Sequence, residues 1–149
     1  LRRKLHISKE ILVAALYTTG VVLPALPESK LSPVKYLPIL LFFLIALINL
    51  IIFSWYEKEN DLRDRQDSVA TLVEEMTIQY ILTGLFVITF SISFYLFFHP
   101  AYHFISLVFI AMAAILLLIF TCKKFFTRND YYRLAGDAVF LFPIVYILL

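Results

Sequence analysis

MTIQYILTGLFVITFSISFYLFFHPAYHFISLVFIAMAAILLLIFTC, residues 76–122, is the stretch that decides the fold. Its 47 residues contain no Asp, Glu, Lys or Arg. A single α-helix of this length would measure about 70 Å, more than twice the thickness of a bilayer's hydrocarbon core. The stretch therefore has to fold back on itself, and the proline and polar rings of residues 99–103 mark the turn. It predicts two transmembrane helices, over residues 75–98 and 102–122.

Three more apolar runs predict further spans on either side of this hairpin. The first covers residues 9–27 and the second covers residues 35–56, which ends in Trp-Tyr, a pair typical of the membrane–water interface. A last run covers residues 131–149, with Arg133 expected to extend toward the lipid headgroups. The pattern thus indicates about five transmembrane helices.

The overall composition leads to the same class of protein. Of the 149 residues, 62% are hydrophobic, whereas a soluble domain of this size is usually about 45–50% apolar. A core this small cannot bury the excess, so lipid has to solvate much of it. We expect an all-α polytopic membrane protein that forms a single transmembrane domain over residues 1–149. Its one cysteine, Cys122, excludes an internal disulfide and a cluster of thiolate metal ligands.

The basic residues predict the orientation in the membrane. With the N-terminus in the cytoplasm, eleven of the thirteen Lys and Arg residues lie inside, and only Lys30 and Lys35 lie outside. This is a strong positive-inside bias. We therefore expect an integral protein of the inner, cytoplasmic membrane whose C-terminus is external.

Acidic residues are concentrated in the predicted cytoplasmic loop 57–74. This loop and the residue after it, Glu75, together contain seven of the eleven acids. If the second span continues as a helix, Glu57, Asp61 and Asp64 fall at positions i, i+4 and i+7 of one face. Carboxylates in this arrangement suit Mg²⁺, a hard cation that keeps several waters and takes one or two carboxylates plus phosphate oxygens. The spacing therefore raises the hypothesis of a magnesium site.

The basic residues of the loop leave two interpretations open. Arg63 and Arg65 are suited to neutralising a phosphate beside the ion. Alternatively, the loop is simply solvated, and its acids pair with Lys58, Arg63 and Arg65. The segment TLVE, residues 71–74, also matches a capping box, which predicts that the third long helix starts there.

Three stretches, spread over nearly the whole chain, share a pattern with one known family. The first runs from KEILVA to GVVLP over residues 9–24. The second, residues 49–72, contains FSWYEKEND and DSVATL, and the third, residues 133–143, contains RLAGD and a final Phe-Pro. Together they resemble the C-terminal half of the UbiA superfamily of intramembrane prenyltransferases. The second stretch is similar to the family's second aspartate-rich motif, D-x-x-x-D followed by S-x-A-T-L.

The resemblance assigns the two acidic positions of this motif to Glu57 and Asp61, and so implies that these residues hold Mg²⁺ and act in catalysis. Glu57 replaces the first aspartate and reaches further, and Arg65 stands where many members have glycine. The family's earlier motif, N-D-x-x-D-x-x-x-D, does not occur in this sequence. We expect the chain to resemble the second half of a nine-helix bundle whose missing N-terminal half supplies that motif.

Members of this family transfer a prenyl group from an allylic diphosphate to an acceptor, often an aromatic ring. The resemblance implies the same Mg²⁺-dependent reaction here, with a prenyl diphosphate and a lipophilic acceptor as partners, membrane lipid around them and no nucleic acid. Asn49 lies eight residues before Glu57, on roughly the same helix face. It is expected to bind substrate together with Arg63, Arg65 and Asp64, although an amide in a membrane helix also serves as an interhelical hydrogen-bonding group.

Two other functions remain open on the sequence. A non-catalytic UbiA-like protein or assembly subunit would use the acidic loop to bind a basic partner. A transporter would need an ionisable group within the membrane, and Asp137 is the one candidate. Arg133 precedes Asp137 by four residues, so we expect these two side chains to pair on their helix.

Overall fold

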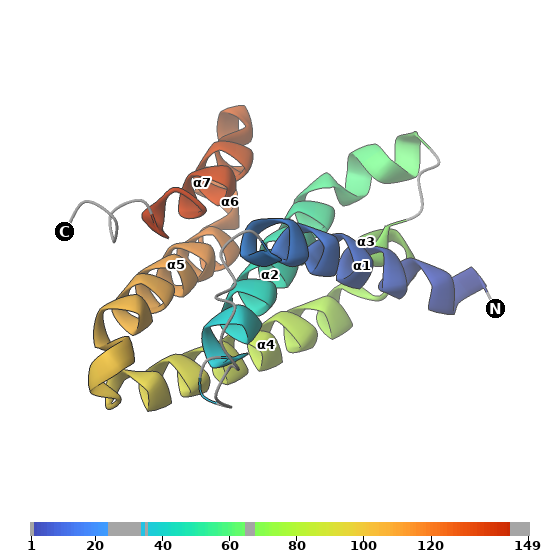
Figure 1. Cartoon of the computed structure of the whole chain (residues 1–149). Coiled ribbons are helices and arrows are strands. Elements are labelled where there is room, and N and C mark those ends of the chain that lie inside the picture. The colour runs from blue at the N-terminus through green and yellow to red at the C-terminus, as the bar shows by residue number, and fades with distance from the viewer. Residues whose placement is uncertain (1, 24–33, 35, 65–67, 144–149) are drawn as a thin grey trace.

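The computed structural model describes residues 2–23, 34, 36–64 and 68–143, with side chains from residue 9 onward. The described chain is all-helical and contains no strand, which confirms the predicted all-α class for this part. Its elements, in order, are α1 (Arg2–Val22), α2 (Tyr36–Arg63), α3 (Val69–Leu72), α4 (Glu75–Phe97), η3 (Pro100–Tyr102), α5 (His103–Thr121), α6 (Lys123–Phe126), η4 (Arg128–Asp130) and α7 (Tyr131–Val139) (Figure 1).

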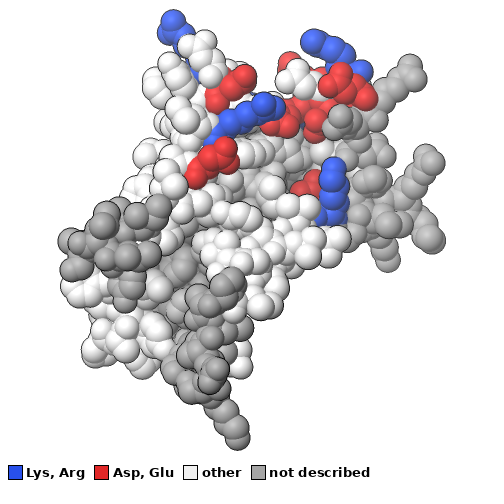
Figure 2. All heavy atoms as spheres, turned by 45° about the horizontal axis from the view of Figure 1, so that its top comes forward, with Lys and Arg blue, Asp and Glu red and all other residues white. Residues whose placement is uncertain are grey.

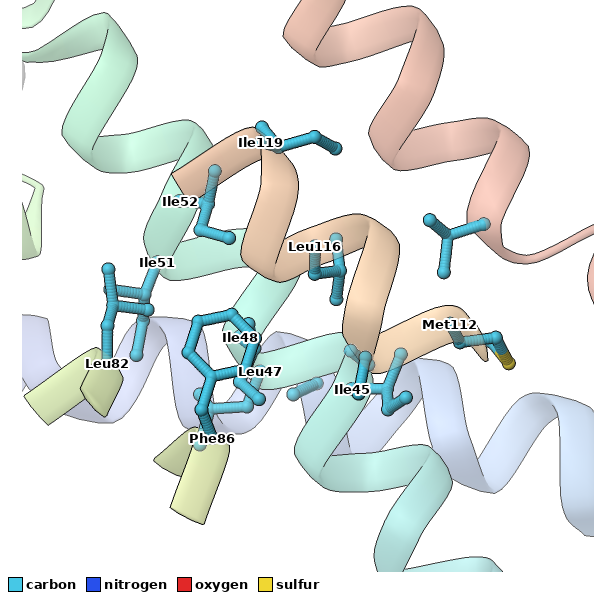
Figure 3. Packing of buried hydrophobic residues seen from close by; sticks show 14 of the residues in the cluster. Ile45, Leu47, Ile48, Ile51, Ile52, Leu82, Phe86, Met112, Leu116 and Ile119 are labelled. Atoms are coloured by element: carbon cyan, nitrogen blue, oxygen red, sulfur yellow. The ribbon is translucent and has the colours of Figure 1, made fainter. Parts of the chain in front are cut away.

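Helix α2 forms the centre of the bundle, and α1, α3, α4, α5 and α7 all contact it. Its sequence is apolar on every side from residue 39 to residue 48, as expected of a helix in the centre of a membrane bundle. Ile45, Ile48 and Ile52 of α2 are fully buried. They belong to one buried cluster with Leu82 of α4 and Leu116 of α5 (Figure 3).

Helices α4 and α5 form the predicted hairpin. The short helix η3 makes the turn, and at its start the Tyr102 N–H donates to the carbonyl of His99. Further along, the Ser106 hydroxyl of α5 donates to the Ser93 carbonyl of α4 at 2.5 Å. Because the apolar stretch cannot remain straight within a bilayer, the turn lies where proline and the histidines interrupt it, as the sequence predicts.

Three helices are long and apolar enough to cross a membrane within the described residues: α2, α4 and the helix that η3 and α5 form together. The first predicted span corresponds in part to α1, and its last residues, 24–27, lie outside the described ones. Nine residues of the fifth predicted span form α7, while residues 144–149 also lie outside. Five spans therefore remain a prediction.

The face that α1 turns toward α2 explains how the two helices pack. Glu10, Ala14 and Thr18 are the buried residues of the described part of α1, and they follow one another at intervals of four. This spacing places them in one row along the helix. Ala14 and Thr18 are small and permit close approach of the two backbones. The same row carries the carboxylate of Glu10 into the interior.

The start of α4 differs from the prediction. Glu74 is its N-terminal capping residue, but the cap has no side-chain hydrogen bond. Thr71 instead belongs to α3, where its hydroxyl oxygen accepts the Ser68 N–H at 2.8 Å. The predicted capping box over residues 71–74 is therefore wrong, because Val73 adopts an extended conformation that separates α3 from α4.

Large apolar side chains cover much of the outer surface. Leu12 and Leu16 of α1, Tyr80 and Phe94 of α4 and Leu134 of α7 are all exposed. A soluble protein rarely exposes so many large apolar side chains on several helices. Together with the three long apolar helices, this surface is that of a helical membrane protein.

Candidate functional site at the end of helix α2

Helix α2 remains helical beyond its apolar part and ends at Arg63. Just past its end, the Asp64 N–H still donates to the Asn60 carbonyl at 2.9 Å. Glu57 and Asp61 are therefore one turn apart on a continuous helix, as the sequence predicts. In Figure 2 the charged side chains of the visible face gather at one end, and the described surface away from that end is uncharged.

A pocket of about 190 Å³ lies between α1, the end of α2 and the residue that precedes α3. We call it the polar pocket. It brings together Glu57 and Asp61, and it adds Glu10 and Ser68, which the sequence did not assign to a site. The full lining is Lys9, Glu10, Val13, Leu50, Ser54, Glu57, Asp61 and Ser68.

One oxygen of Glu57 is held by α7. The Arg133 Nη2 and Nε atoms lie 2.8 and 2.9 Å from Glu57 Oε1, and the Tyr132 hydroxyl lies 3.4 Å from the same atom. The expected pair between Arg133 and Asp137 is replaced by this contact, because α7 packs across α2 and places Arg133 beside Glu57. Glu57 Oε2 has no hydrogen-bond partner among the described residues, so it is available to a ligand.

Glu10 connects α1 to the beginning of α3. Its Oε1 atom accepts the Val69 N–H at 3.1 Å, while the Ser54 hydroxyl oxygen of α2 accepts the Ala70 N–H at 3.2 Å. Glu10 is 8% exposed, and its Oε2 atom is buried without a hydrogen-bond partner in the described structure. The signal for Glu10 in the sequence was an acidic residue at the very edge of an otherwise uncharged span, a position that favours a functional role.

A second pocket, of about 180 Å³, adjoins the polar pocket, and the two share Val13 and Leu50 as lining residues. We call it the aromatic pocket. It contains Asn49, which the sequence placed at a substrate cavity, and the Asn49 Oδ1 atom is buried without a partner in the described part of the chain. The full lining is Val13, Tyr17, Ala46, Asn49, Leu50, Phe53, Asp137 and Phe140.

Helix α7 reaches the aromatic pocket through a glycine. A Cβ atom added at Gly136 would lie 2.5 Å from Asn49 Oδ1 and 2.5 Å from a ring carbon of Phe53. Only a residue without a side chain permits this approach. Gly136 therefore places its neighbour Asp137 in the aromatic pocket, beside Asn49.

The remaining predicted site residues lie elsewhere. Arg63 and Asp64 are exposed and do not line either pocket, and Arg65 lies outside the described residues. Glu75 belongs to a different contact, since its Oε1 atom accepts the Trp55 Nε1–H at 3.1 Å and lies 3.7 Å from Lys123 Nζ. Of the three acidic residues predicted to share one helix face, Glu57 and Asp61 line the polar pocket and Asp64 does not.

The donor set of the polar pocket fits a hard cation. Its carboxylates and hydroxyls, from Glu10, Glu57, Asp61, Ser54 and Ser68, offer only oxygen atoms, the ligand type that Mg²⁺ prefers. Among the described residues, no group of three or more His, Cys, Asp or Glu side chains converges closely enough to bind a bare metal ion. An ion that keeps part of its water shell does not need such convergence.

Comparison of the chain with protein-family models, curated proteins and solved structures finds no match. What the protein does therefore has to be inferred from its own residues and from the two adjoining pockets.

Proposed function

We propose that this chain is the C-terminal half of a Mg²⁺-dependent intramembrane prenyltransferase, which transfers a prenyl group from an allylic diphosphate to a lipophilic acceptor. The supporting observation is the adjacency of the two pockets. A carboxylate-lined pocket at the charged end of α2 shares Val13 and Leu50 with a pocket lined by aromatic rings. A prenyl diphosphate has the same two parts, a strongly anionic head and an apolar tail.

The diphosphate head needs a cation to enter the polar pocket. Glu10, Glu57 and Asp61 carry three formal negative charges there, against one positive charge on Lys9. Glu57 Oε2 and the Asp61 carboxylate are the groups that would hold Mg²⁺ at the motif positions. A bound Mg²⁺ supplies electrostatic stabilisation of the charge that develops on the departing diphosphate.

The aromatic pocket suits the reacting end of the prenyl chain. Tyr17 and Phe140 meet edge to face, with ring centroids 5.1 Å apart, and Phe53 completes this wall. The faces of aromatic rings attract positive charge, so they stabilise an allylic group as its bond to the diphosphate lengthens. Their apolar surface also keeps water away from that group. The family's first acidic motif would come from the N-terminal half that the resemblance implies.

Binding measurements test this proposal directly. In the detergent-solubilised full-length protein, we expect Mg²⁺ to raise the affinity for farnesyl diphosphate, because this ion binds carboxylates together with the phosphate oxygens of a substrate. The variant D61N should lose this enhancement, and E59Q should keep it, because Glu59 is exposed and lies outside both pockets. Equal affinity with and without Mg²⁺ in the unmodified protein would rule the proposal out.

The alternative, a non-catalytic subunit, draws support from the Arg133–Glu57 pair. This contact occupies one oxygen of the first motif position and joins α7 to α2, a structural role that needs no metal. In that case the exposed acids Glu59 and Asp64 would dock a basic partner. The same titration separates the two functions, because a docking surface shows no Mg²⁺-enhanced affinity for an isoprenoid diphosphate.

A further inference from the structure

Glu10 is the least expected member of the polar pocket. It is 8% exposed, and one of its two carboxylate oxygens accepts the Val69 N–H. The other oxygen, Oε2, is buried and unpartnered among the described residues. A buried carboxylate oxygen without a donor or cation is costly, so native structures rarely leave one in this state.

Ser68 lines the same pocket and directly precedes Val69, the residue whose N–H Glu10 accepts. It is also 8% exposed, and its buried hydroxyl oxygen faces the Thr71 N–H in the capping box that begins α3. Glu10 belongs to α1 and Ser68 is the residue that precedes α3, yet both line the polar pocket. A hydroxyl oxygen has two lone pairs, so Ser68 can accept a further hydrogen bond, and one ligand that supplies donors can contact both Ser68 and the unpartnered oxygen of Glu10.

The chemistry of the pocket defines that ligand. An ionised carboxylate only accepts hydrogen bonds, so the ligand has to present donors or positive charge to Glu10. The formal charges of the lining side chains, three negative and one positive, also favour a cation. At ~30 Å³ per water, the volume of about 190 Å³ holds on the order of six water molecules, the size of a divalent cation with its water shell.

We propose that Glu10 and Ser68 form a second side of the cation site, opposite Glu57 and Asp61. Glu10 Oε2 and Ser68 Oγ accept hydrogen bonds from the water ligands of a hydrated divalent cation. This inference rests on the function proposed above and extends it with a carboxylate from α1. Since Glu10 also holds the Val69 N–H, cation binding would strengthen the connection between α1 and α3.

A single substitution separates this role from a purely structural one. Glutamine at position 10 keeps an oxygen that accepts the Val69 N–H but removes the negative charge. With Mn²⁺ as the probe, we expect E10Q to bind the ion ~10-fold more weakly than the unmodified chain, within the range seen for groups that orient a metal's ligands. S68A should weaken binding in the same direction. The control E59Q removes an equal charge from the exposed surface and should leave the affinity unchanged.

Each outcome decides between defined alternatives. If E10Q binds Mn²⁺ like the unmodified protein while D61N does not, Glu10 is only a tether, and the proposed function survives. Equal losses in E10Q and E59Q would mean that general surface charge attracts the ion, and would also overturn the role of Glu10. If the unmodified protein binds no Mn²⁺, the proposed function itself fails. If E10Q unfolds at a lower temperature, its weaker binding has a structural explanation, and the Mn²⁺ affinity of S68A is then the test. An unchanged Mn²⁺ affinity in S68A overturns the inference.

Discussion

Arg133 and Glu57 are separated by 76 positions in the sequence, yet two nitrogens of the guanidinium lie within 2.9 Å of a single carboxylate oxygen. Arg133 is 54% exposed, so the pair contributes less than about 1 kcal/mol to stability. Its main effect is geometric. By holding Glu57 Oε1 toward α7, Arg133 leaves Glu57 Oε2 as the oxygen available to the polar pocket.

Gly136 offers the sharpest residue-scale prediction about packing. In G136A the added methyl would lie 2.5 Å from Asn49 Oδ1 and Phe53, so α7 has to move or these side chains have to shift. We expect a loss of roughly 1–3 kcal/mol in the free energy of unfolding, as for other overpacked sites. Denaturation with sodium dodecyl sulfate, followed by circular dichroism, measures it.

The matched control is G84A in α4, where an added Cβ meets nothing within 4 Å. This variant should be neutral or more stable by about 0.5–1 kcal/mol, because alanine favours a helix over glycine. If G136A were tolerated as well as G84A, the close contact between α7 and α2 would be incorrect.

At the scale of elements, the length of α2 explains where the polar pocket lies. Its 28 residues extend for about 42 Å, whereas the hydrocarbon core of a bilayer is about 30 Å thick. With the apolar part inside the membrane, the charged last two turns have to extend into the water. Glu57 is thereby placed at the boundary, close enough to lipid for an apolar tail and close enough to water for a diphosphate.

The α4–α5 hairpin gives a testable prediction at this scale. The Ser106 hydroxyl is buried and donates to the Ser93 carbonyl across the two helices, whereas the exposed Ser91 hydroxyl donates to the Val87 carbonyl of its own helix. S106A should therefore lower the free energy of unfolding by about 0.6–2 kcal/mol, the range for interhelical hydrogen bonds in membranes.

S91A is the comparison, and it should change the free energy of unfolding by less than about 0.5 kcal/mol, as surface substitutions usually do. Both values come from the same denaturation assay. Equal effects of S106A and S91A would show that the Ser106 hydrogen bond does not hold the hairpin together.

At the scale of the whole molecule, the charged side chains that the structure describes on the face in Figure 2 gather at one end of the bundle. The end of α2 with its acids and the α4–α5 turn lie at opposite ends of the structure (Figure 1). Eleven of thirteen basic residues fall on the predicted cytoplasmic side, so the positive-inside rule predicts that the polar pocket faces the cytoplasm.

Cysteine labelling tests this orientation. In a C122S background, which removes the single native cysteine, E59C reports on the end of α2 and A101C reports on the α4–α5 turn. A membrane-impermeant maleimide should label A101C in intact cells and E59C only in inverted vesicles. The reverse pattern would invert the orientation, and labelling of both positions from one side would contradict the spans.

The apolar hairpin and part of the candidate site were predictable because they depend on local sequence patterns. The charge-free stretch 76–122 predicts the hairpin, and the spacing of Glu57 and Asp61 predicts their shared helix face. Glu10 and Ser68 were not predictable as partners of that face. They are 58 residues apart, and no local periodicity relates them to each other or to α2.

The sequence by itself determined the three long apolar helices, where the apolar hairpin turns and that two motif carboxylates stand one turn apart on α2. These are consequences of hydropathy and helical periodicity, which act over a few residues at a time. The tertiary structure alone decided that Arg133 pairs with Glu57 rather than Asp137, and that Glu10 is buried beside Ser68. Those contacts depend on how α1 and α7 pack against α2, and such packing is set by the fit of whole helix surfaces rather than by any short run of residues.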